Sequence, residues 1–178
     1  MTCCQNNVAS GVCNKPAEGA ASCPFVVYLA NLAVWNAKLH NLHWNVVGRA
    51  FVQVHEFTES LYDEVNEQFD AVAEACKMRG KFPPVKLSDY LAVATIKEVE
   101  ARDYPVSEVI EIVEADMKLM RDLAETIRNG SDEKGDYLMV AQFEDYLAKY
   151  AKNLWFLAAM QKGCCGNCSA CGGCKRPQ

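Results

Sequence analysis

Apolar residues recur every three or four positions through most of this chain, from about residue 23 to residue 162. That spacing is typical of amphipathic α-helices, and no segment shows the alternation expected of a half-buried strand. Glycines and prolines interrupt the pattern at a few places and mark where helices end. The sequence predicts an all-α four-helix bundle with long helices at about 23–47, 51–79, 105–129 and 131–161, and a short helix near 88–91 in the connection between helices two and three.

The composition agrees with one globular domain. The chain has 178 residues, of which 51% are apolar and 23% are charged, so it can bury a sizeable core and is not disordered as a whole. Its formal charge of -5 argues against a protein whose entire surface is a basic platform for nucleic acid.

Eight of the ten cysteines lie outside the predicted bundle, Cys23 lies at its first residue, and only Cys76 lies well inside it. A secreted disulfide scaffold would spread its cysteines through the fold. We therefore expect three segments: a Cys-bearing N-terminal tail (1–22), the bundle (23–162) and a Cys-rich C-terminal tail (163–178). The N-terminus lacks a signal-peptide pattern and no apolar run is long enough to span a bilayer, which predicts a cytoplasmic protein without membrane contact.

The predicted helix 51–79 has two distinct faces. Successive residues turn by about 100°, which gathers one apolar stripe: Val54, Leu61, Val65, Phe69, Val72 and Cys76. A second stripe carries two i,i+4 pairs, His55 with Glu59 and Asp70 with Glu74, and each pair presents two metal-binding groups side by side. An antiparallel arrangement of the first two helices would bring His43 next to His55.

These five residues cannot form one site within one chain. Along a straight helix, His55 and Asp70 are about 22 Å apart, and the ligands of one ion must all lie within a few ångströms of it. A two-fold dimer whose second helices cross antiparallel near residues 64–65 would face the two histidines and Glu59 with the two later carboxylates of the partner subunit. Two imidazoles and three carboxylates suit iron, with zinc and manganese as competitors.

The motifs resemble those of the Dps proteins, the mini-ferritins named as DNA-binding proteins from starved cells. The resemblance covers about residues 24–161. Five candidate ligands fall within 32 residues at the family's spacing. The matching segments are Asn41-Leu42-His43-Trp44-Asn45-Val46, His55-Glu56, Asp70-x-x-x-Glu74 and Leu154-Trp155-Phe156.

This resemblance implies a ferritin-like fold and a twelve-subunit hollow shell with di-iron ferroxidase centres at its dimer interfaces. The implied reaction is oxidation of iron(II), typically by hydrogen peroxide and alternatively by oxygen, followed by storage of ferric mineral and protection from oxidative damage. Glu59 stands where the family usually has Asp, so its way of binding iron is open. Trp44 resembles the tryptophan of the family's site, and it is either a packing residue or a sink for a stray oxidising equivalent.

The tails admit several interpretations. The C-terminal tail repeats Cys-x-x-Cys at Cys165, Cys168, Cys171 and Cys174, which is compatible with zinc, copper or part of an iron–sulfur cluster, or with thiol–disulfide chemistry. Few basic residues lie in either tail, so we expect DNA binding to be weak or absent. The alternative functions are a nucleoid DNA-binding protein and a metal-binding or redox scaffold for the thiol tails.

Acidic residues cluster near the predicted start of the fourth helix. They are either a solvated helix start or the lining of the three-fold pores that the resemblance implies: Asp132, Glu133 and Asp136.

Overall fold

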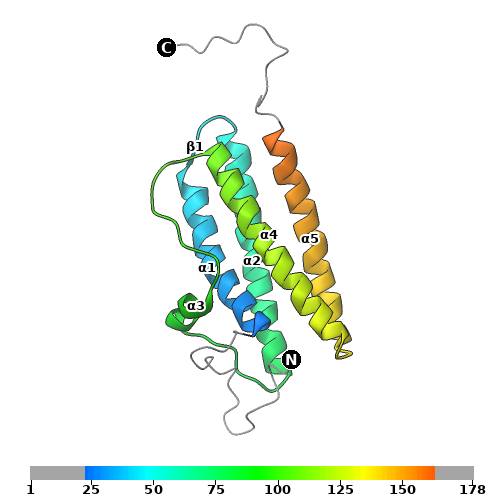
Figure 1. The fold of residues 1–178 in the computed structure, drawn as a ribbon. Helices are drawn as coiled ribbons and strands as arrows, with labels where there is room; N and C mark the ends of the chain where they lie inside the picture. The colour runs from blue at the N-terminus through cyan, green and yellow to red at the C-terminus, as the bar shows by residue number, and fades with distance from the viewer. Residues whose placement is uncertain (1–22, 163–178) are drawn as a thin grey trace, which may run out of the picture.

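A computed structural model describes residues 23–162, and the two predicted tails lie outside them. Two antiparallel helix pairs form a bundle (Figure 1). The first pair is α1 (Pro24–Asn45) with α2 (Phe51–Met78), and the second is α4 (Val106–Asp132) with α5 (Tyr137–Gln161). The short helix α3 (Leu87–Val93) lies in the long connection that crosses from the end of α2 to the start of α4. This confirms the predicted all-α four-helix bundle with a short helix in the connection between helices two and three.

The boundary between the last two helices was predicted wrongly. Helix α4 does not stop at Asn129-Gly130 but continues to Asp132, and α5 begins at Tyr137 rather than at residue 131. Gly130 is unfavourable within a helix by about 1 kcal/mol, but the buried Ile127 and an i,i+4 ion pair from Arg128 to Asp132 support this last turn. The chain reverses at Gly135, whose φ of 67° suits glycine.

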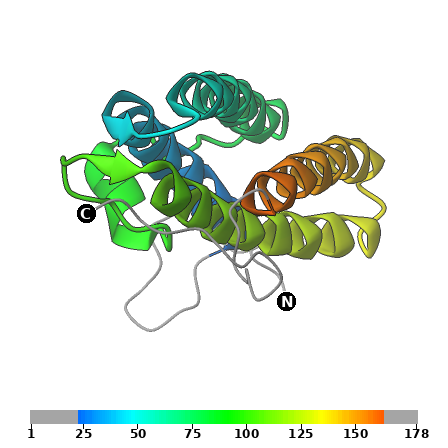
Figure 2. The same ribbon diagram turned by 90° about the horizontal axis from the view of Figure 1, so that it is seen from above.

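A two-residue parallel strand pair was not predicted. Strand β1 (Val46–Val47) pairs with β2 (Tyr104–Pro105), which joins the turn after α1 to the end of the crossing connection. As a result α1 ends at Asn45, two residues before its predicted end. Val46 and Tyr104, one from each strand, are buried. The strand pair lies at one end of the bundle, beside α1 and the start of α4 (Figure 2).

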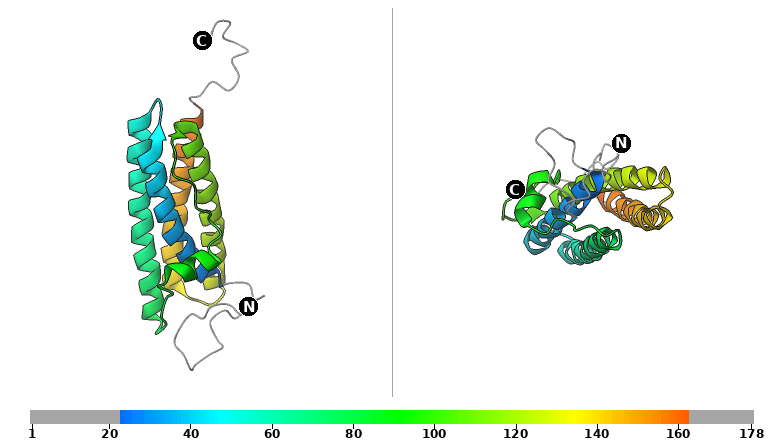
Figure 3. Two further views of the ribbon diagram at one scale, coloured as in Figure 1. Left: turned by 90° about the vertical axis from the view of Figure 1, so that its left-hand side faces the viewer. Right: turned by 90° about the horizontal axis from the view of Figure 1, so that it is seen from below.

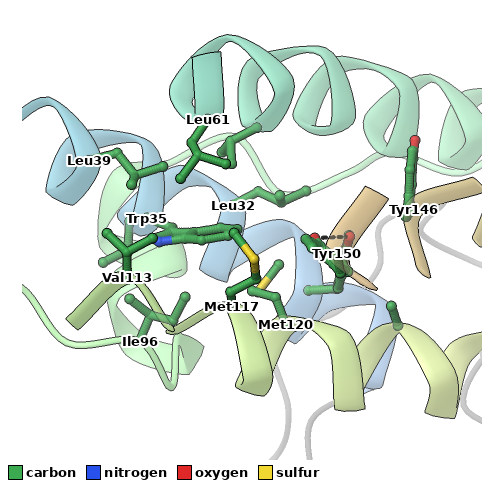
Figure 4. Packing of buried hydrophobic residues seen from close by; sticks show 14 of the residues in the cluster. Leu32, Trp35, Leu39, Leu61, Ile96, Val113, Met117, Met120, Tyr146 and Tyr150 are labelled. Atoms are coloured by element: carbon green, nitrogen blue, oxygen red, sulfur yellow. Dashed lines mark hydrogen bonds between the residues drawn. The ribbon is translucent and has the colours of Figure 1, made fainter. Parts of the chain in front are cut away.

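The core lies where the helix pairs meet. Trp35 on α1 is buried among Leu61 of α2 and Met117 and Met120 of α4 (Figure 4). Of the predicted apolar stripe on α2, Phe69 is half-buried and the other five side chains are buried. The predicted helix period therefore identified the core face of α2.

The crossing connection, with α3, packs along α1 (Figure 3). Two asparagines on α1 fasten it to the bundle. Asn31 Oδ1 accepts hydrogen bonds from the backbone N–H groups of Thr95 and Ile96, at 2.7 and 3.1 Å. Asn41 Nδ2 donates to the carbonyl of Val99 at 2.9 Å. Among the described residues, no helix is both long and apolar enough to cross a membrane.

Candidate metal centre

His43 and His55 lie side by side, as the antiparallel arrangement of α1 and α2 predicts. Their rings stack with centroids 3.6 Å apart and planes inclined by 20°. His43, at the end of α1, is buried, and His55, one turn into α2, is partly exposed. The connection between the two helices is short and brings their ends together, which places two imidazoles at one end of the bundle.

Each histidine is held by the backbone of the other. His43 Nδ1 lies 2.9 Å from the carbonyl oxygen of His55, and His55 Nδ1 lies 2.9 Å from the carbonyl oxygen of His43. A carbonyl only accepts hydrogen bonds, so both Nδ1 atoms carry a proton. In the neutral rings both Nε2 atoms then keep a lone pair, the arrangement found in metal-binding histidines with an oriented ring.

Thr58 and Tyr62, which belong to none of the predicted metal-binding motifs, complete the surroundings of this pair. Thr58 Oγ1 lies 3.3 Å from His43 Nδ1 and donates to the backbone of α2. Tyr62 places its ring edge-on to His43, with centroids 5.3 Å apart and an angle of 88°. Both residues follow His55 by about one or two helical turns, and that spacing is the signal that could have found them.

The three carboxylates do not join the histidines within the chain. No group of three or more metal-binding side chains occurs among residues 23–162. The carboxylate of Glu59 instead interacts with Tyr62: partial desolvation raises the pKa of the Tyr62 hydroxyl, and the negative charge of Glu59 raises it further. Glu59 is exposed on the same helical stripe as His55.

Asp70 and Glu74 lie towards the far end of α2. Both are exposed, and in the described part of the chain neither forms an ion pair or a side-chain hydrogen bond. Two like charges four residues apart repel each other without a cation. These carboxylates are therefore available to a partner, about 22 Å along the helix from His55.

Trp44 is 68% exposed and makes its ring contact with His40, at 5.6 Å between centroids. Within the described residues it forms no ring contact with His43 or His55. His40 in turn stacks on Tyr62 with centroids 3.9 Å apart.

Two of the three acids predicted to line a pore have partners in the chain. Asp132 forms an ion pair with Arg128 at 3.0 Å, and Asp136 forms one with Arg79 at 2.5 Å. Asp136 also caps α5 by accepting from the backbone N–H of Met139. Glu133, between them in sequence, is exposed. The four thiols predicted as a tail site, Cys165, Cys168, Cys171 and Cys174, lie outside the described residues.

Comparison with known proteins places this geometry in a family. The family described as "Ferritin-like domain" matches residues 28–164. The "DNA protection during starvation protein" of Helicobacter pylori is 32% identical over 130 residues, which are 73% of this chain and 90% of the relative. The protein of that name from Listeria monocytogenes is 29% identical over 132 residues, which are 74% of this chain and 85% of that relative.

Solved structures agree with the sequence comparison. A Dps protein from Bacillus brevis superposes with a TM-score of 0.73 at 30% identity, covering 78% of this chain and 92% of that structure. Antigen TpF1 from Treponema pallidum gives a TM-score of 0.76 at 28% identity, covering 83% and 99%. The chain belongs to the ferritin-like family and, within it, to the Dps-type proteins.

Proposed function

We propose that this protein oxidises iron(II) at di-iron sites shared between two subunits and stores the ferric product in a hollow, twelve-subunit shell. The observation that carries the proposal is the division of α2 into two half-sites. Near the start of α2, His55 lies beside His43 of α1, with both Nε2 atoms available. The other end bears Asp70 and Glu74, which have no partners in the described part of their own chain.

A single two-fold register would unite the half-sites. If the axis passes between Glu64 and Val65, His55 faces Glu74 of the partner subunit and Glu59 faces Asp70 of the partner subunit. Val52 lies on the same helical stripe and is 54% exposed, an apolar side chain that a partner would cover. This exposure supports the same face of α2 as a subunit interface.

The ligand set suits the oxidation of iron. Carboxylates favour the ferric product and imidazoles fix the geometry. Two iron(II) ions held together give one electron each to hydrogen peroxide, which with two protons becomes two water molecules and releases no hydroxyl radical. The substrates are therefore iron(II) and peroxide, with oxygen as the alternative oxidant.

Complementation between two variants tests the shared site. His43→Ala/His55→Ala removes the imidazoles, and Asp70→Asn/Glu74→Gln removes the later carboxylates. Each variant alone should assemble but oxidise iron(II) slowly with peroxide. Co-assembled, a mixed dimer has one site with every native ligand and one that keeps only Glu59, so a random mixture should recover about a quarter of the wild-type rate.

Asp63→Asn/Glu67→Gln is the matched control, because it neutralises two exposed acids at the same spacing on the same helix. It should oxidise iron at the wild-type rate. Wild-type kinetics in both ligand variants would disprove the site. Loss of activity in each variant without recovery in the mixture would disprove its sharing between subunits.

DNA coating is the alternative that the names of the relatives raise, and the charge of -5 opposes it. Gel shifts across a salt series decide this question, and we expect no shift at physiological salt. For the C-terminal tail, we propose that its thiols bind zinc, copper or an iron–sulfur cluster, and metal analysis with and without residues 163–178 tests that role separately.

A further inference from the structure

Tyr62 on α2 lies against the histidines of α1 and beside the carboxylate of Glu59. Its ring stands edge-on to His43 with centroids 5.3 Å apart, and it stacks flat on His40 at 3.9 Å with an angle of 20°. Glu59 precedes Tyr62 by three residues, so the two side chains are neighbours on the surface of one helix. The Tyr62 ring is therefore held against α1 by two histidines and adjoins a candidate iron ligand.

The backbone of Tyr62 is fastened to α1 as well. Asn36 Nδ2 donates to the carbonyl of Tyr62 at 3.3 Å, and the carbonyl of Asn36 accepts from His40 Nδ1 at 2.8 Å. One residue of α1 thus orients the stacking histidine and fixes the turn of α2 that carries the tyrosine. Because the ring is held at one face, at its edge and at its backbone, the packing sets the direction of its hydroxyl.

This hydroxyl interacts with the carboxylate of Glu59. Partial desolvation raises the pKa of the Tyr62 hydroxyl most, and the charges of Glu59 and Asp63 raise it further. Of the two carboxylates, Glu59 also takes part in a hydrogen bond with the hydroxyl. An ionised carboxylate only accepts hydrogen bonds, so the phenol is the donor. The exposed Glu59 side chain loses rotamer freedom in this contact, and one of its oxygens is held in place.

We propose that Glu59 binds iron through one carboxylate oxygen and that Tyr62 is the positioning residue that holds the other oxygen. This inference rests on the proposed function and specifies the way in which Glu59 binds. His55 and Glu59 are one helical turn apart, so an ion at His55 Nε2 has the nearer oxygen of Glu59 within reach. A hydrogen bond to a ligating carboxylate orients the ligand and raises the affinity for the ion.

The length of the Glu59 side chain makes this arrangement possible. Its carboxylate stands one methylene group farther from the helix than that of an Asp would, so its two oxygens extend to the ion and to the Tyr62 hydroxyl. We expect the carboxylate of a Glu59→Asp variant to reach the ion but not the hydroxyl. In that variant Tyr62 would have no part in metal binding.

Binding of manganese(II) to the assembled, metal-free protein tests the inference. Carboxylates suit this ion and thiolates do not, so the cysteines of the tails do not compete for it. The electron paramagnetic resonance signal of free manganese(II) measures how much is bound. Tyr62→Phe keeps the ring contacts and removes the hydroxyl, and it should weaken binding about 10- to 100-fold. In the Glu59→Asp background the same change should have no further effect.

Comparing the two backgrounds separates positioning from packing. If Tyr62 only packs, Tyr62→Phe changes the affinity by the same factor in both backgrounds, and the inference is overturned. Unchanged affinity in Tyr62→Phe overturns it as well. Tyr137→Phe is the matched control and should bind like wild type, because Tyr137 is 77% exposed at the start of α5, at the opposite end of the bundle (Figure 1).

The histidine variant shows whether the measured binding belongs to the site. His43→Ala/His55→Ala should lose the tight binding of manganese(II), and binding that survives in this variant overturns the inference. The proposed function is decided separately, by iron oxidation in the co-assembled ligand variants. If that activity is recovered while Tyr62→Phe binds manganese(II) like wild type, the shared site stands and only the positioning role is wrong.

Discussion

Lys38 on α1 and Asp116 on α4 are each only 8% exposed, and they form a buried ion pair between the two helix pairs. Lys38 Nζ lies 2.7 Å from Asp116 Oδ2, but that oxygen makes no well-angled hydrogen bond. Burial raises the pKa of the Asp116 carboxyl, and the Lys38 ammonium partly opposes the rise. Desolvation therefore outweighs the attraction for this pair.

Removing one charge of this pair should reduce the stability of the fold more than removing both charges. Asp116→Ala leaves a buried unpaired ammonium and should lower the free energy of unfolding by about 3–5 kcal/mol. Lys38→Met with Asp116→Leu removes both charges and should be neutral or stabilising by up to about 4 kcal/mol. Chemical denaturation of the two variants measures the difference, and a double variant less stable than Asp116→Ala would contradict this prediction.

The pH dependence has a definite sign. The folded-state pKa of Asp116 lies above its ordinary value of 3.8, so the folded state binds that proton more tightly than the unfolded chain. Its contribution to stability is present at low pH and is lost as the pH rises between the two pKa values. The Lys38→Met/Asp116→Leu variant should lack this contribution to the change of the free energy of unfolding with pH.

At the candidate site, the sequence could predict that His43 and His55 lie next to each other, but it could not predict which side chains pack around them. His43 and His55 could be paired from the sequence because they lie at similar distances on either side of one turn between antiparallel helices. The positions of Thr58, Tyr62 and His40 depend on how α1 and α2 interlock, and helix periodicity contains no information on the angle between two helices. The stack of His40 on Tyr62 thus emerged only with the fold.

Among the elements, the turn between α4 and α5 depends on Asp136. Its Oδ1 accepts from Met139 at the start of α5, and its Oδ2 pairs with Arg79 just after α2. One side chain thus caps a helix and connects two helix ends. Because both side chains are about one-third exposed, the ion pair contributes less than the cap.

Two substitutions separate these roles. Asp136→Asn keeps the capping oxygen and should lower the free energy of unfolding by less than about 1 kcal/mol. Asp136→Ala removes cap and ion pair together and should cost about 1–2 kcal/mol. Thermal unfolding of both variants checks the order. Equal losses would mean that the capping hydrogen bond adds nothing to stability, and iron uptake by Asp136→Asn would test the pore role proposed for this acid.

The helices themselves were predictable, and their junctions less so. Periodicity located the core face of α2 because 28 residues repeat one pattern many times. The two residues of β1 offer no repeat at all, and the stop expected at Asn129-Gly130 was overridden by the burial of Ile127. Local signals decide a helix end only where tertiary contacts do not oppose them.

At the scale of the whole molecule, the single chain leaves large apolar side chains in water. Trp44, Val52, Met78 and Trp155 are each more than half exposed, although the core contains many smaller buried groups. Such exposure is typical of surfaces that subunits cover. Two of these residues, Val52 and Met78, lie at opposite ends of α2, as a two-fold antiparallel contact requires.

A new charge at Val52, with a compensating change at Lys77, tests the proposed register directly. With the axis between Glu64 and Val65, Val52 lies opposite Lys77 of the partner subunit. Val52→Lys would then oppose two ammonium groups at each end of the interface, so sedimentation should show smaller species and peroxide-driven iron oxidation should fall. Adding Lys77→Glu to the same chain should restore both, because each new lysine then meets a carboxylate across the axis.

Lys77→Glu alone is the control for lost packing, since Lys77 also lies over the Phe82 ring at 3.7 Å. It should assemble, because it places a carboxylate opposite an apolar side chain at the rim. If the Val52→Lys variant assembles and oxidises iron like wild type, this face of α2 is not part of the subunit interface. A variant that dissociates but is not rescued by Lys77→Glu would keep the face and reject the register, and with it the pairing of His55 with Glu74 across subunits.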